Sequence, residues 1–77
     1  MVHTYQILSD KKCGFVATVV TDSAFEAQNL SISSTPYLRR KFGVVFESFY
    51  TGGMSFQISC SDRDILKRAV EMLMQET

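Results

Sequence analysis

Few side chains in this sequence could do chemistry, and their spacing matches no common catalytic or metal-binding arrangement. The only histidine is His3, near the start of the chain, where a proton transfer is hard to position. No Cys-x-x-Cys, histidine pair or calcium-type carboxylate loop occurs. Asp62 and Asp64 lie where a helix is predicted to begin, and capping and the helix dipole explain them. We therefore expect no catalytic residue, no metal and no cofactor, in a protein that is not an enzyme.

The two cysteines differ in their predicted environments. Cys13 follows Lys11 and Lys12 in a predicted exposed turn, where nearby cations favour the reactive thiolate form. Cys13 is therefore a candidate reactive thiol. Cys60 alternates with predicted core positions, which indicates a buried, inert thiol. Two cysteines are too few for a disulfide scaffold, and without a recognisable export signal we expect a cytoplasmic protein.

Residues 37–42 form the strongest local anomaly, because three of the eight basic residues are consecutive here between aromatic ones. Arg39, Arg40 and Lys41 could neutralise phosphates while Tyr37 stacks on a base. The same residue types are common in contacts with proteins, and a solvated connector with no partner is the third interpretation. The formal net charge is zero, whereas a duplex-DNA binder usually has a basic excess. We favour a protein contact, with nucleic acid as the alternative.

Residues 44–50 form the second anomaly, a long aromatic stretch with high β propensity and a single charge. As an exposed edge strand it would promote aggregation. It is either buried as a central strand or covered by another chain, through homodimer sheet extension or by a different protein. The candidate partner-binding residues are therefore Tyr37, Arg39, Arg40, Lys41, Phe49 and Tyr50.

The first half of the chain predicts a hairpin followed by helix. Residues 3–8 alternate weakly and residues 15–20 strongly, and a turn-forming segment joins them. Ser23 and Glu26 have the spacing of a capping box, which predicts a helix that ends near Leu30 before a loop at 31–35. Pro36 and Gly43 then bracket a second, short helix, for which a strand is the competing interpretation.

The second half repeats this order. Residues 54–61 alternate between apolar and polar positions, with Met54 and Phe56 on the apolar face, and residues 62–75 predict an amphipathic helix. The predicted apolar stripe of that helix is Ile65, Leu66, Ala69, Met72 and Leu73. A shift of 39 residues aligns the two halves, which indicates a weak repeat of two ββα units at about 1–38 and 39–77.

These elements predict an α+β fold in a single small domain, residues 1–77, with the order ββα-(short α)-ββα. The four strands form one antiparallel sheet with the helices packed on one face. The other face would carry Val16, Val20 and part of the set that includes Val45 and Phe49, more apolar than a solvated face should be.

The length of 77 residues leaves no room for a dinucleotide-binding unit or a barrel. No apolar run approaches the ~20 residues that span a bilayer, so no membrane partner is expected. With no catalytic set and surplus apolar surface, we expect a protein-binding module. It would be a regulator or inhibitor that sterically occupies a surface of a larger protein.

Overall fold

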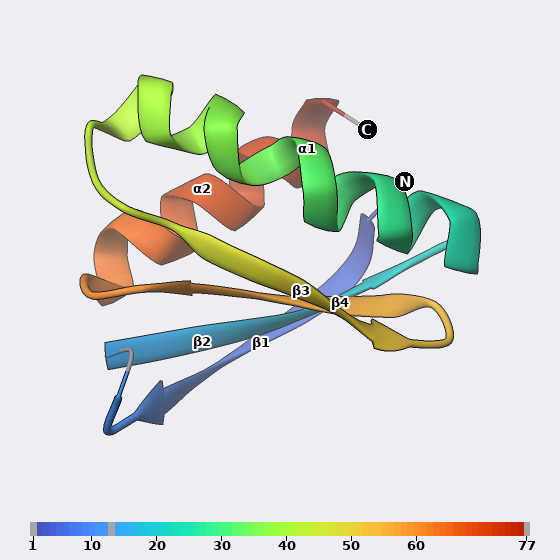
Figure 1. Cartoon of the computed structure of the whole chain (residues 1–77), viewed down its shortest axis with the longest axis horizontal. Helices are drawn as coiled ribbons and strands as arrows, with labels where there is room; N and C mark the ends of the chain where they lie inside the picture. Colours follow the sequence, from blue (N-terminus) through green and yellow to red (C-terminus); the bar gives the residue numbers. More distant parts are fainter. Residues whose placement is uncertain (1, 13, 77) are drawn as a thin grey trace.

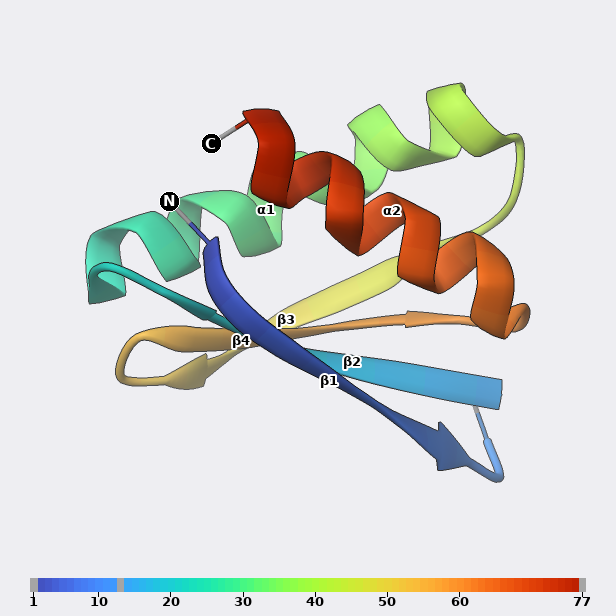
Figure 2. The same cartoon turned by 180° about the vertical axis from the view of Figure 1, so that it is seen from behind.

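Six elements in the order ββαββα form two layers in the computed structural model, which describes residues 2–12 and 14–76. The elements are β1 (Val2–Asp10), β2 (Gly14–Thr21), α1 (Ala24–Phe42), β3 (Glu47–Gly52), β4 (Ser55–Cys60) and α2 (Arg63–Glu76). The strands make one antiparallel sheet in the order β1-β2-β4-β3. Both helices lie on the same side of it (Figure 1, Figure 2). The predicted class and the placement of the helices on one face are confirmed.

The core lies between the sheet and the helices and is centred on the two inner strands. Val19 of β2 stands opposite Phe56 of β4, and Ala17 stands opposite Ile58. All four side chains are fully buried. The helices complete the core with Ala27, Leu38, Leu66, Ala69, Val70 and Leu73. Val70 is missing from the apolar stripe predicted for α2.

Both helices begin at a side chain that caps free backbone N–H groups. Ser23 Oγ accepts a hydrogen bond from the Glu26 N–H at 3.1 Å, as the capping-box spacing predicts. Asp62 Oδ1 accepts from the N–H groups of Asp64 and Ile65 at 2.9 and 3.1 Å. The two caps are 39 positions apart, which is the offset of the predicted repeat.

The same offset relates residues at the centre of the sheet. Thr18 and Gln57 are 39 positions apart and stand directly opposite one another in β2 and β4. Gln57 Nε2 donates to Thr18 Oγ1 at 3.4 Å. The strands β2 and β4 are antiparallel, and Thr18 and Gln57 are related both by the 39-residue offset and by direct pairing. This pair therefore lies on a local two-fold axis between the two halves of the chain. The end of the first predicted unit, residue 38, falls inside α1.

α1 is one continuous helix of 19 residues, so the predicted loop at 31–35 and the separate helix at 36–42 are wrong. Pro36 lies within the helix, where it lacks the N–H that would bond to the preceding turn. The predicted end of the segment is confirmed, because Gly43 adopts a left-handed φ of 69° and its N–H donates to the Arg39 carbonyl at 2.8 Å.

Small side chains on the buried side of α1 explain its continuity. Ala27, Ser31, Ser34 and Leu38 follow one another at helical spacing, and all are buried against the sheet layer. The Ser48 hydroxyl of β3 also donates to the Ser31 carbonyl. Local propensity disfavours serine in a helix, but tertiary packing of a small-residue stripe overrides it here.

β3 lies at the edge of the sheet, so the interpretation of residues 44–50 as a central strand is wrong. Burial still alternates along this segment, with Phe46 fully buried and its neighbours Val45 and Glu47 exposed. Pairing with β4 begins only at Glu47. A hairpin returns the chain as β4, which pairs with β2 and leaves β3 outside.

Replacement of Pro36 by Ala should stabilise the protein, because it restores a backbone donor at an exposed position in the interior of α1. We expect the free energy of unfolding to rise by up to about 3 kcal/mol. Urea denaturation followed by circular dichroism measures it, with Asn29→Ala as a control on the exposed side. A loss of stability in P36A would show that Pro36 starts a separate helix.

Phe56→Ala should lower the free energy of unfolding by about 3 to 5 kcal/mol, because it leaves a cavity in the centre of the core. The matched control is Phe49→Ala, which removes the same atoms from an exposed position of the neighbouring strand. The control should change stability by less than about 1 kcal/mol. Similar losses in the two variants would contradict the assignment of the core face.

Candidate protein-interaction surface

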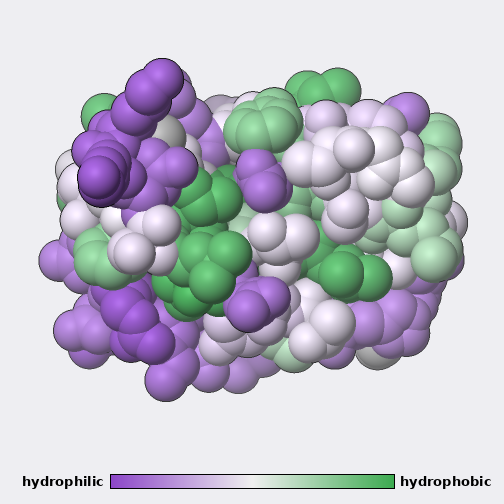
Figure 3. Space-filling model, turned by 90° about the horizontal axis from the view of Figure 1, so that it is seen from below, coloured by the Kyte–Doolittle hydropathy of each residue, from purple (hydrophilic) through white to green (hydrophobic). Residues whose placement is uncertain are grey.

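The side of the sheet opposite the helices is uncovered (Figure 3). The strand register arranges its side chains in three rows across the sheet. The rows are Leu8–Val16–Ser59–Glu47, Gln6–Thr18–Gln57–Phe49 and Thr4–Val20–Ser55. We call these residues the open sheet face.

Apolar side chains on the open sheet face surround a polar centre. Leu8 and Phe49 are 54% and 61% exposed, and Val16 and Val20 are half-buried. The hydrogen-bonded pair of Thr18 and Gln57 lies between them. Figure 3 accordingly shows hydrophobic areas separated by pale and hydrophilic ones. The predicted placement of Val16, Val20 and Phe49 on the second face is confirmed, and Leu8 is a further apolar residue there.

Two further exposed apolar residues flank the strands. Val45 precedes β3 and continues the alternation of Glu47 and Phe49. Met54 lies in the turn before β4, and its exposure corrects the prediction that it shares the buried face of Phe56. Pairing geometry explains the correction, because the strand begins one residue later, at Ser55.

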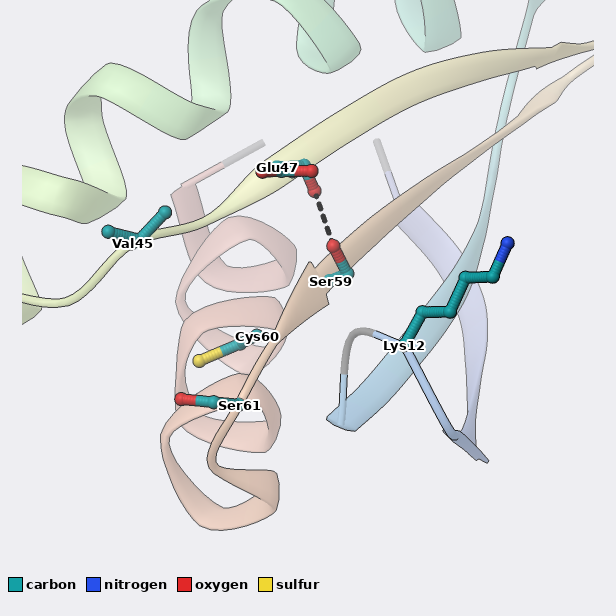
Figure 4. A pocket seen from close by; sticks show the side chains of 6 residues that line it. All are labelled: Lys12, Val45, Glu47, Ser59, Cys60 and Ser61. Atoms are coloured by element: carbon teal, nitrogen blue, oxygen red, sulfur yellow. Dashed lines mark hydrogen bonds between the residues drawn. The ribbon is translucent and has the colours of Figure 1, made fainter.

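A pocket of about 250 Å³ opens beside the row that contains Glu47 and Ser59 (Figure 4). Its lining is Lys12, Val45, Glu47, Ser59, Cys60 and Ser61. Ser59 Oγ donates to the Glu47 carbonyl at 3.4 Å within the pocket. Small-molecule sites usually occupy roughly 300–1,000 Å³, so this volume suits one side chain of a partner better than a substrate.

The basic cluster predicted to bind a partner is partly structural. Arg39 Nε and Nη2 donate to the Phe46 carbonyl at 3.3 and 3.0 Å, so Arg39 joins the end of α1 to the segment before β3. Lys41 Nζ lies 5.8 Å from the ring centroid of Tyr37, which is half-buried against the core. Arg40 is exposed.

The six predicted site residues do not form one patch. Phe49 and Tyr50 are neighbours on a strand, so their side chains point to opposite faces. Phe49 lies on the open sheet face, whereas Tyr50 packs towards the core and its hydroxyl donates to the Gly53 carbonyl at 2.6 Å. The basic cluster belongs to the helix layer. Cys13, the candidate reactive thiol, lies outside the described residues, and Cys60 is buried as predicted.

Arg39→Ala should lower the free energy of unfolding by about 1 kcal/mol, because it leaves the Phe46 carbonyl without two donors. Arg40→Ala is the matched control at the next position and should change stability by less than about 0.5 kcal/mol. Thermal and urea denaturation of both variants measure the difference. Equal stabilities would assign Arg39 to the solvated surface together with Arg40.

Residues 2–12 and 14–76 contain no candidate metal site and no candidate membrane-spanning helix. Within them, no three His, Cys, Asp or Glu side chains gather where they could hold a metal ion. His3 forms a surface pair with Asp22. Neither helix, over its described residues, has the length and apolar character needed to cross a membrane. The chain matches no protein-family model, no curated protein and no solved structure.

Proposed function

We propose that this chain is a non-enzymatic protein-binding module that covers part of a larger protein with its open sheet face. The observation that carries this proposal is the exposure of Leu8 and Phe49 on a face that the chain's own helices leave uncovered. Larger exposed apolar patches mark protein interfaces, and on this face Leu8 stands beside Val16, with Phe49 on the opposite edge strand.

Phe49 is the best candidate for an anchor of the contact. It stands on an edge strand, next to backbone groups that no further strand of residues 2–12 and 14–76 pairs. Burial of a large apolar side chain contributes about 1.5 to 3 kcal/mol. A side chain of the partner would fill the pocket beside Glu47, where the carboxylate of Glu47 and the ammonium of Lys12 supply charges of opposite sign.

The dimensions of the chain favour steric action. The described residues span 27 × 24 × 17 Å, and the sheet extends along the longest and the shortest of these dimensions, with the helix layer stacked on it. One face therefore offers a compact contact, smaller than the area of about 800 Å² that each partner contributes to a standard interface. A module that consists of one such face and its supporting helices is suited to regulate or inhibit a larger protein by covering it.

Variants on the open sheet face should lose a protein target that the unmodified chain captures. Tagged protein is incubated with a lysate of its source cells at near-physiological salt, with and without nuclease. We expect a stoichiometric protein that survives nuclease with the unmodified chain and is lost with Phe49→Asp and with Leu8→Asp. Circular dichroism checks that both variants are folded.

The control for this capture is the double variant Arg40→Ala and Lys41→Ala in the helix layer, which should retain the target. Nucleic acid in the eluate, together with loss of capture in the control variant and on nuclease treatment, would instead support nucleic-acid binding through the basic cluster. Retention of the target by both Phe49→Asp and Leu8→Asp would overturn the assignment of the open sheet face.

A further inference from the structure

α1 carries an apolar ridge on the side that faces away from the sheet. Phe25 and Ile32 are each 75% exposed, more than any other large hydrophobic side chain in the described residues. They are seven positions apart, which is two helical turns, so they lie on one line along the helix. Pro36, also exposed, continues that line one turn later. We call Phe25, Ile32 and Pro36 the α1 ridge.

The middle of the α1 ridge, around Ile32, has no charged neighbours. Residues 27–38 include no Asp, Glu, Lys or Arg, and the exposed neighbours of Ile32 are Gln28, Asn29 and Ser33. The solvent side of a helix in a monomeric protein is normally rich in charged residues. An uncharged middle with a protruding Ile32 is typical of a surface that packs against another protein surface.

Charge is confined to the two ends of α1, and its sign differs between them. Asp22 and Glu26 lie at the start of the helix, and the basic residues Arg39, Arg40 and Lys41 lie in its last turn. At about 1.5 Å per residue the two ends are nearly 30 Å apart, well beyond the Debye length of about 8 Å at physiological salt. The ends therefore attract or repel a docked helix independently.

We propose that the α1 ridge pairs with the α1 ridge of a second copy of this chain, antiparallel and with a two-fold axis at Ile32. In this arrangement Phe25, seven residues before the axis, faces Arg39 of the second copy, seven residues after it. The acidic start of each helix then lies beside the basic end of the other, twice in the contact. A second copy supplies Ile32 to pack against Ile32 on the axis, and a charge pattern that complements the two ends of the helix.

The charge pattern argues against a lipid surface as the occupant. A helix that lies on a membrane carries Lys and Arg along the flanks of its apolar side. The flanks of the α1 ridge are Gln28, Asn29 and Ser33, and the basic residues are confined to one end. Pairing through the ridge uses the helix layer, so it does not depend on the proposed function of the open sheet face.

Sedimentation equilibrium and light scattering on the purified full chain test the proposal without any target protein. One helix face is smaller than a standard interface, so the pairing is expected to be weak and concentration-dependent. Between about 5 and 500 µM the mass should rise from 8.7 kDa towards twice that value. A chain that remains monomeric throughout this range would overturn the proposal.

Variants locate the contact. Ile32→Asp places a charge on the axis and should weaken pairing at least about tenfold, and the milder Phe25→Ala should weaken it in the same direction. Phe49→Asp on the open sheet face is the control and should pair as the unmodified chain does. Loss of pairing in Phe49→Asp but not in Ile32→Asp would assign the dimer to the sheet and overturn the proposal.

The salt dependence tests the antiparallel arrangement. Attraction between opposite ends predicts that the dissociation constant rises several-fold as salt is added. The double variant Arg40→Glu and Lys41→Glu makes both ends of α1 acidic, so its weaker pairing should tighten with salt, because salt screens repulsion. The same salt dependence in the unmodified chain and this variant would exclude antiparallel pairing.

Discussion

A single apolar layer between one sheet and two helices holds this chain together, and the other features depend on it. Val19 and Phe56, opposite each other on the two inner strands, are fully buried, and so is Leu66 of α2 above the sheet. Both helices lie on the same side because the inner strands carry their buried residues only there. Over residues 2–12 and 14–76, the six elements place no helix or strand on the second face. The one-sided core therefore explains the open sheet face, but it does not explain why Leu8 and Phe49 are apolar.

The parts of the fold that could be predicted from the sequence have local causes. Alternation assigned the faces of β2 and β4, capping-box spacing located the start of α1, and the acidic residues Asp62 and Asp64 located the start of α2. The continuity of α1 could not be predicted in this way, because Ser31 and Ser34 disfavour a helix locally and favour it only when packed against a sheet. The spacing of Ala27, Ser31, Ser34 and Leu38 was the signal for that packing. The edge position of β3 could not be predicted either, because the order of strands in a sheet depends on pairing between segments that are distant in the sequence.

Of the six predicted partner-binding residues, only Phe49 lies on the open sheet face. Residues that are close in the sequence need not lie on the same surface of the protein. Phe49 and Tyr50 are adjacent in sequence but lie on opposite faces of β3. Arg39 and Arg40 are also adjacent, yet the Arg39 guanidinium donates to a backbone carbonyl while Arg40 is exposed. Residue type alone does not separate these roles. The alternation along the strands did place Val16, Val20 and Phe49 on the second face, because successive side chains of a strand point to opposite faces.

The two surfaces lie on opposite layers, and this arrangement has a consequence for binding. A contact through the α1 ridge leaves the open sheet face accessible, because the ridge points away from the sheet. In a two-fold pair the two open sheet faces point outward, separated by about twice the 24 Å extent of one chain across its two layers. Such a pair presents two identical faces, so a target with repeated sites gains avidity from the second contact, whereas a target with one site does not. Because the pairing is weak, the fraction of paired chains, and with it the fraction of bound target, would then rise with the concentration of the chain.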